Sequence, residues 1–369
     1  MANRHRTLGG FLPFFVVALL GACSTARLPA LDEALGVGTP GEAGGLGGRV
    51  LDTAGRPIAG AQVRIAGGPG TTTGTAGEYR FPAVRPSPRL ALSASADGHA
   101  AVVEHAAVSP AWETRHDVVL APLDSAAFTA EQGATLSLPG GGSVTIQPNT
   151  LLRRDGRPAA GAVRALWAFL DPRDDARLIA GPGDLTLDTG AGAMPLVSGG
   201  MLRLELTDAR GHPLELDGGR PAELRVPAEL SRRPGPRADS LPATGLYRFD
   251  DATGRWVWVR GLRMDAARRQ LTVPLTGLRE WVGLNRPELA TCVEVVVRTA
   301  AGLTRPNTAV DAFGADYNGH TRGHTDASGR VRLLARQNAT VRISAEGRSV
   351  TVATSAAATP CADAGVLVV

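Results

Sequence analysis

Lysine is absent from this chain, and aromatic residues make up only 4% of its 369 residues. All 39 basic residues are therefore arginines, and they face 35 acidic residues. The arginines form no long basic run, whereas a nucleic-acid interface usually combines clustered basic residues with stacking aromatic rings. We therefore expect no nucleic-acid partner.

The motifs of several enzyme classes are also absent. No serine stands in a G-x-S-x-G elbow, and the zinc motif H-E-x-x-H does not occur. The glycine-rich stretch 67–74 lacks the lysine of a phosphate loop, so it predicts a long turn. The acidic pairs 174–175 and 250–251 lie in turn contexts, where carboxylates bond to backbone N–H groups. These observations favour a protein that is not an enzyme and needs no cofactor.

A long apolar run occurs only at the start of the chain. Basic residues at 4–6 precede an apolar stretch over 8–22, which is the layout of a secretory signal and too short to span a membrane. The stretch ends in Leu-Gly-Ala-Cys at 20–23 and resembles the lipobox of bacterial lipoproteins. The resemblance implies a signal peptide over 1–22 and lipidation of Cys23. An ordinary signal peptide with an incidental cysteine is the alternative.

The lipoprotein resemblance also implies a cellular location. Ser24 stands where inner-membrane lipoproteins of enteric bacteria carry an aspartate, so we expect an outer-membrane protein, lipid-anchored and either periplasmic or surface-exposed. Loss of the signal leaves 37 arginines against 35 acidic residues, a net charge of +2. The lipid, and not a basic patch, would therefore hold the protein to the membrane.

Cysteine is scarce as well. With Cys23 lipidated, Cys292 and Cys361 remain in a chain exported to an oxidising compartment. We predict a disulfide between them; two free thiols are the alternative.

Beyond a flexible linker over 23–45, rich in Gly, Ala and Pro, the chain consists of short alternating stretches and turn signals. Residues 46–124 resemble the carboxypeptidase regulatory-like domain, a small sandwich of prealbumin-like or starch-binding-like fold. The matching positions are Gly48, Val50, Asp52, Gly55, Pro57, Gly60, Val63, Thr73, Gly77, Tyr79, Phe81 and Gly98. In that family they are architectural and not catalytic.

Residues 288–369 are similar to the same domain and form a more divergent second copy. The stretch TDASGRVRL at 325–333 aligns without gaps on TGTAGEYRF at 73–81. Residues 125–287 resemble the central region of cartilage intermediate layer protein through the order of their landmarks, including the hairpin turn at 208–211 and the strand–turn–strand at 249–256. We therefore expect an all-β chain of three β-sandwich domains in series, of Ig-like or prealbumin-like type.

Two histidines in the second copy, His320 and His324, are the best candidates for a ligand site. Four-residue spacing on a helix would put both rings on one face, as zinc prefers, and Asp326 could add a carboxylate. Alignment with the first copy argues against a helix, and on a loop this spacing fixes no geometry. We therefore predict no metal site.

These inferences lead to one expectation of function. The chain should be a non-enzymatic, lipid-anchored envelope protein that acts as a structural, adhesive or protein-interaction module. A carbohydrate-binding lipoprotein with a glycan ligand, or an accessory subunit of an envelope enzyme, is the alternative.

Overall fold

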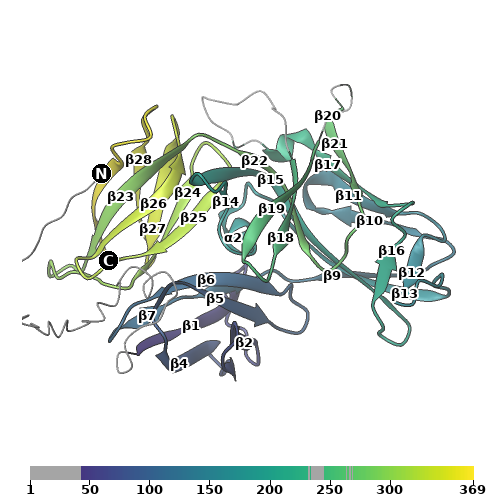
Figure 1. Cartoon of the computed structure of the whole chain (residues 1–369), viewed down its shortest axis with the longest axis horizontal. Coiled ribbons are helices and arrows are strands. Elements are labelled where there is room, and N and C mark those ends of the chain that lie inside the picture. Colours follow the sequence, from purple (N-terminus) through teal and green to yellow (C-terminus); the bar gives the residue numbers. More distant parts are fainter. Residues whose placement is uncertain (1–42, 232, 234–244, 263, 266, 268) are drawn as a thin grey trace, which may run out of the picture.

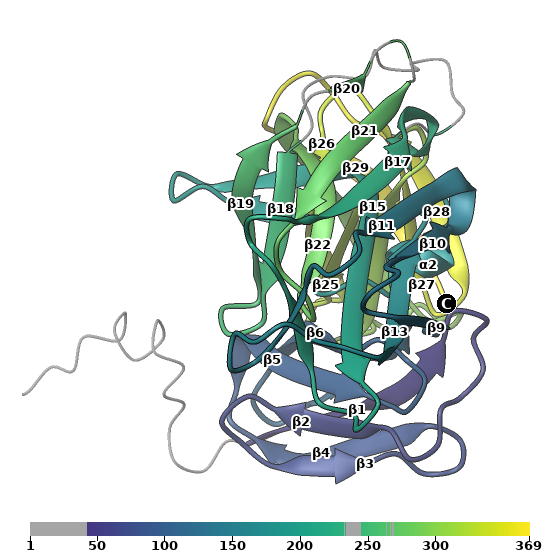
Figure 2. The same ribbon diagram turned by 90° about the vertical axis from the view of Figure 1, so that its right-hand side faces the viewer.

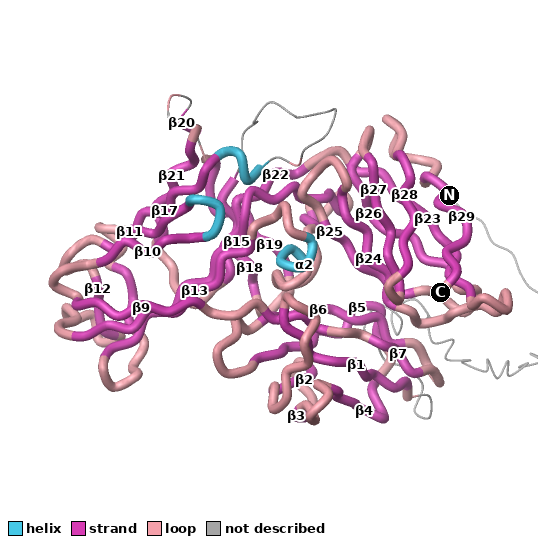
Figure 3. Tube along the Cα trace, turned by 180° about the vertical axis from the view of Figure 1, so that it is seen from behind, coloured by secondary structure: helices cyan, strands magenta, loops and turns pink. Residues whose placement is uncertain are grey.

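The computed structural model describes residues 43–231, 233, 245–262, 264–265, 267 and 269–369, and almost all of its regular structure is β-strand (Figure 3). This confirms the all-β fold class. The predicted signal peptide, Cys23 and most of the linker lie outside the described residues, although β1 already begins at Gly44. Within the described residues, no helix is long and apolar enough to cross a membrane.

The first sandwich packs two sheets over one core. Its valines, leucines and aromatic residues alternate with polar residues, which places one face of each strand inward. One sheet contains β1 (Gly44–Asp52), β4 (Glu78–Val84), β7 (Glu113–Arg115) and β8 (Val118–Leu120). The other has the order β3 (Gly70–Thr72), β2 (Gln62–Ile65), β5 (Ser87–Ser95) and β6 (Val102–Val108).

The third sandwich repeats this topology strand by strand. Its first sheet has the order β26 (Arg330–Arg336), β23 (Ala290–Arg298) and β29 (Ala362–Val368), and β29 runs parallel to β23 just as β7 and β8 run parallel to β1. Its second sheet has the order β25 (His320–His324), β24 (Ala309–Gly314), β27 (Thr340–Ala345) and β28 (Arg348–Ala353). Strand β25 therefore occupies the position of β3.

Two buried threonines show that the gapless alignment of the two copies holds in space. The Thr73 hydroxyl donates to the carbonyl of Ile58 at 2.7 Å and accepts the N–H of Ala61 at 2.9 Å. In the third sandwich the Thr325 hydroxyl donates to the carbonyl of Arg305 and accepts the N–H of Thr308 at 2.9 Å. Each threonine joins the two connections that cross between the sheets of its sandwich.

The central sandwich is larger. Its first sheet has the order β10 (Ala134–Leu138), β11 (Gly142–Ile146), β17 (Ala222–Pro227), β21 (Gln270–Leu275) and β20 (Met264–Asp265). Its second has the order β19 (Arg255–Gly261), β18 (Gly245–Asp250), β22 (Trp281–Pro287), β15 (Ala193–Asp208), β13 (Ala162–Leu170) and β9 (Asp124–Thr129), with β14 (Thr186–Asp188) beside β15. A small pair, β12 (Leu151–Arg153) and β16 (Leu214–Leu216), and the short helices η1 (Pro139–Gly141), α2 (Asp175–Leu178) and η2 (Ala228–Ser231) complete it.

One hairpin turn recurs in all three sandwiches, at 52–56, 153–157, 208–212 and 299–303. In each, the first residue donates its N–H to the fifth carbonyl, and the fourth residue, a glycine, donates back to the first. The four glycines have φ between 76° and 80°, a left-handed conformation that glycine adopts without a steric penalty. The turn predicted at 208–211 is thus one member of a repeated device.

The three sandwiches do not form an open string. Each one touches the other two, and the first sandwich lies across the ends of both of its neighbours (Figures 1 and 2). The apolar core of the first sandwich continues onto the outer face of the larger central sheet, through Phe249, Trp256 and Trp281. Trp281 is fully buried, and its indole N–H donates to the carbonyl of Ala101 at 2.8 Å.

The disulfide predicted from the cysteine count is present. Cys292 in β23 is bonded to Cys361, whose Cα lies 4.6 Å from that of Cys292. The bond fixes the start of β29 beside β23, so it closes the third sandwich along its parallel strand pair.

Gly329 provides a test of the repeated architecture. It has φ +75°, and a Cβ there would lie 2.6 Å from the carbonyl oxygen of Val297. We expect Gly329→Ala to lower the free energy of unfolding by about 3 kcal/mol, because left-handed strain and the clash add. Gly347, with φ +78° and no atom within 4 Å, is the matched control, and Gly347→Ala should cost about 1 kcal/mol. Equal denaturant midpoints for the two variants would contradict this assignment.

Candidate functional site at the junction of the three sandwiches

The described residues concentrate their buried ionisable groups where the three sandwiches meet. A cavity of about 140 Å³ opens there, lined by Arg89, Glu104 and His105 of the first sandwich, Asp184 of the central one, and Arg322 and His324 of the third. We call the following set the junction cluster: Glu104, His105, His116, Asp311, His320, Arg322 and His324.

Strand β25 supplies the third sandwich's side of the cluster. The residues at 320–324 form a strand paired with β24, so the expectation of a loop around the two histidines was wrong. In a strand, alternate side chains share a face, which aligns His320, Arg322 and His324 toward the neighbouring sandwiches. Thr321 and Gly323 face the domain core, where a Cβ on Gly323 would meet Leu333 and Val331 within 3 Å.

An ion pair between Arg322 and Asp311 forms the centre of the cluster. The two side chains face each other across the β24–β25 pair and make two contacts, of 2.7 and 3.2 Å. Burial alone would raise the pKa of Asp311, but attraction to Arg322 and a hydrogen bond from His320 outweigh it and lower the pKa. Burial would likewise lower the pKa of Arg322, and Asp311 raises it. Both groups are therefore charged at neutral pH.

The remaining donors of this ion pair connect it to its surroundings. The third nitrogen of Arg322 donates to the backbone carbonyl of Asp117 in the first sandwich at 3.1 Å. The His320 ring donates Nε2–H to Asp311 at 2.8 Å, since a carboxylate can only accept. The backbone carbonyl of His320 accepts the N–H of Leu185 in the central sandwich at 2.9 Å. One strand thus contacts both neighbours.

Two histidines from different sandwiches stack at the same place. The rings of His116 and His324 lie 5.5 Å apart with their planes inclined by 29°. Among the described residues, the two ring nitrogens of His116 have no hydrogen-bond partner. The Nε2 of His324 has none either. Burial, then the charge of Arg322, lowers the pKa of His116 well below its usual range and that of His324 to about 4. Both rings are therefore neutral at pH 7.

Strand β6 contributes two ionisable groups whose pKa values shift in opposite directions. Burial raises the pKa of Glu104 well above its usual range, although the charge of Arg322 opposes the shift. Burial and the charges of Arg89 and Arg255 lower the pKa of His105 to about 4. Arg89 also donates to the carbonyl of Gly254 in the central sandwich at 2.7 Å. Burial at the contact between sandwiches thus favours the uncharged forms of both Glu104 and His105.

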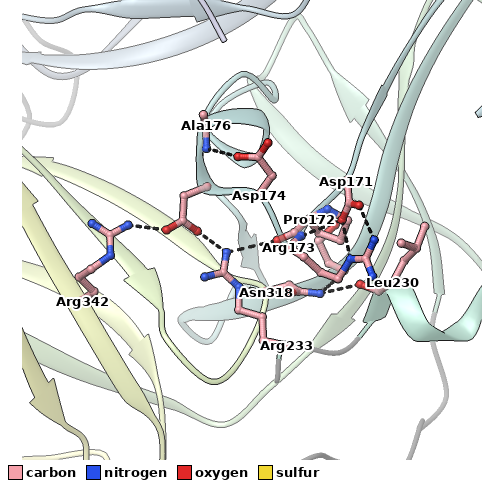
Figure 4. A network of polar contacts seen from close by, with 11 residues as sticks. Asp171, Pro172, Arg173, Asp174, Ala176, Leu230, Arg233, Asn318 and Arg342 are labelled. Carbon is pink, nitrogen blue, oxygen red and sulfur yellow. Dashed lines mark hydrogen bonds and ion pairs between the residues drawn. The ribbon is translucent and has the colours of Figure 1, made fainter. Parts of the chain in front are cut away.

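A second polar network joins the central and third sandwiches (Figure 4). Asp175, in helix α2, pairs with Arg233 of its own sandwich and with Arg342 of β27. Asn318 donates to the carbonyls of Leu230 at 2.8 Å and Ser198 at 3.0 Å. The guanidinium of Arg342 also lies 4.8 Å from the centre of the Phe313 ring. The interface is thus both charged and specific in its geometry.

The acidic pair 174–175 therefore has two roles. Asp174 caps α2 by accepting the N–H of Ala176 at 3.0 Å, as the turn interpretation predicted (Figure 4). Asp175 instead bridges two arginines across a domain boundary, which the sequence did not indicate.

The residues considered for a metal do not come together. His320 bonds to Asp311, and Asp326 accepts hydrogen bonds from Ser328 and Arg330 within its own turn. Throughout the part of the chain that the structure describes, there is no group of three or more His, Cys, Asp or Glu side chains that could hold a metal ion. His116, the ring that contacts His324, was missed because it stands alone in the sequence.

A sugar that stacks on this protein would need exposed aromatic rings. Tyr79 is buried and donates from its hydroxyl to the carbonyl of His116. Trp112 is 50% exposed. Trp256 is buried against Phe249, while Trp258, two residues along the same strand, is 59% exposed.

Arg322→Met should lower the free energy of unfolding of the chain by about 3–5 kcal/mol, because Asp311 stays buried without its cation. Arg330→Met is the matched control. Arg330 pairs with Glu294 on the surface of the same sandwich with half its side chain exposed, and its loss should cost no more than about 1 kcal/mol. Urea unfolding of the two variants measures the difference; a similar effect of both would contradict a structural role for the buried pair.

Comparison with known proteins finds relatives of parts of this chain. The curated relatives include cartilage intermediate layer protein 2 of Mus musculus, 37% identical over 125 residues, and of Homo sapiens, 30% identical over 162 residues. These alignments cover 34% and 41% of this chain but only 10% and 14% of the relatives.

Solved structures give only remote similarity. The Bacillus anthracis TIE protein matches with a TM-score of 0.21 over 89% of this chain and 50% of its own. The major pilin SpaD of Corynebacterium diphtheriae matches with a TM-score of 0.20 over 82% of this chain and 86% of its own. Both are 8% identical, and scores this low support no functional argument.

The most specific match lies in the first sandwich. Residues 45–121 match the family model of the carboxypeptidase regulatory-like domain, the family whose glycine, proline and aromatic positions the sequence displays. The first sandwich of this chain is a carboxypeptidase regulatory-like domain.

Proposed function

We propose that this chain is a non-enzymatic, lipid-anchored protein of the bacterial cell envelope that acts as a rigid scaffold for protein partners. The observation that carries the proposal is the three-way junction, because buried hydrogen bonds and ion pairs fix each sandwich to both others. A protein held in one shape presents its outer surfaces at constant spacing, which is what a structural or adhesive module requires.

The chemistry of the buried groups supports the same conclusion. Each charged side chain at the centre of the junction already has a partner within the chain, as Arg322 has in Asp311 and Asp175 has in Arg233 and Arg342. Groups committed in this way hold domains together and are poorly placed to exchange protons with a substrate. The lipid on Cys23, joined through the linker, would hold this body at a root-mean-square distance of roughly 25 Å from the membrane.

Crosslinking in intact cells tests the proposal. The full-length chain carrying an affinity tag at its C-terminus should fractionate with membranes and recover a defined envelope protein after crosslinking. Cys23→Ala, which removes the acylated thiol, should lose both properties while folding normally. Recovery of only abundant outer-membrane proteins, or membrane fractionation unaffected by Cys23→Ala, would contradict the proposal.

A further inference from the structure

The contact between the first and third sandwiches contains more ionisable groups than its ion pair needs. His116 belongs to the segment between β7 and β8, and His324 ends β25, so the stacked rings come from two different domains. His116 is fully buried, and the His324 ring lines the cavity at the junction. We propose that His116 and His324 form an acid-sensitive latch: the neutral rings stack and hold the two sandwiches together, and the protonated rings repel and release them.

A positive charge on His116 or His324 would add to that of Arg322, and among the described residues no free carboxylate next to the rings would balance it. Arg322 lies beside both rings, and its charge opposes protonation of each. Asp311, whose charge favours protonation of both rings, already binds both Arg322 and His320. A proton on His116 would therefore add an unpaired buried charge next to an existing cation, which costs far more than the stacking of neutral rings returns.

Other groups face the pair from each packed element. The His324 ring also hydrogen-bonds to the backbone of Arg115, which favours protonation weakly. The charged or titratable side chains around the latch are Glu104 and His105 on β6, Arg89 on β5, Arg115 and Asp117 beside His116, Asp311, His320 and Arg322 on the third sandwich, and Asp184 and Arg255 on the central one.

The direction of the pH effect follows from these shifts. An exposed histidine has a pKa of about 6.5, while His324 in the closed contact has a pKa of about 4. The open state therefore binds more protons between these values, so the contact is strongest above pH 6.5 and weakens as the pH falls toward 4. Glu104 acts in the opposite sense, because its raised pKa means that the closed contact retains a proton that the open state releases. His105, whose pKa is also lowered to about 4, acts in the same sense as the two latch histidines.

The cavity gives the latch access to solvent. It opens beside His324 and is roomy enough for several water molecules, since one occupies about 30 Å³ in the liquid. Water can therefore approach His324 without prior separation of the sandwiches. The third sandwich is also closed independently by its disulfide, so release of the contact need not unfold it.

Hydrogen–deuterium exchange of the full chain at pH 7.5 and pH 5.0, corrected for the intrinsic rate, tests the latch. Backbone amides of 114–118 and 320–324 should exchange faster at pH 5.0, by roughly 30-fold for the His324 shift alone, while the central sheet should not change. The double variant His116→Gln with His324→Gln should lose the part of this pH response that the latch contributes, leaving only the opposed effects of His105 and Glu104. His212→Gln is the matched control, because His212 lies exposed in a turn of the central sandwich, and it should behave as the wild type.

Two further measurements keep the test decisive if the double variant opens at every pH. His324→Phe preserves a flat ring against His116 but removes one titration, so its response should be smaller than that of the wild type. Glu104→Gln removes the opposing carboxyl and should make the acid response steeper. Wild-type exchange that is equal at both pH values, or imidazole NMR signals showing both rings protonated while the contact stays closed, would overturn the proposal.

Discussion

The burial of Arg322 is the constraint on which the arrangement of the three sandwiches depends. A guanidinium can leave water only if its charge and its donors are matched, and here Asp311 supplies two acceptors while the Asp117 carbonyl of another sandwich supplies a third. The third sandwich satisfies the charge by itself, but the last hydrogen bond needs the first sandwich in place. The pair thus links the fold of one domain to the position of another.

The same logic extends around the junction. Asp175 is shared by arginines of the central and third sandwiches, and the indole of Trp281 in the central sandwich finds its acceptor in the first. Trp281 and Asp175 thus each find a polar partner in a neighbouring domain. Contacts of this kind are specific, because a slip in position would leave a donor or a charge unpaired in the interior. This is why the three sandwiches form one body.

Much of this architecture could be predicted from the sequence. Alternation of apolar residues, the glycine turns and the gapless match of Thr325 to Thr73 report interactions within one domain, between residues whose spacing the fold fixes. The disulfide followed from cysteine count and compartment alone. The junction could not be predicted in the same way. Polar residues at alternate positions of β25 look like an ordinary solvent-facing edge, and only the placement of another domain shows that His320, Arg322 and His324 are covered.

Small-angle X-ray scattering of residues 43–369 at pH 7.5 tests the central claim, that the three sandwiches form a single fixed body, most directly. The account predicts a radius of gyration close to about 20 Å, the value of a compact chain of this length, and a scattering curve that fits the arrangement in Figure 1 without domain motion. A value of about 26 Å or more, fitted best by three domains in a flexible line, would contradict it.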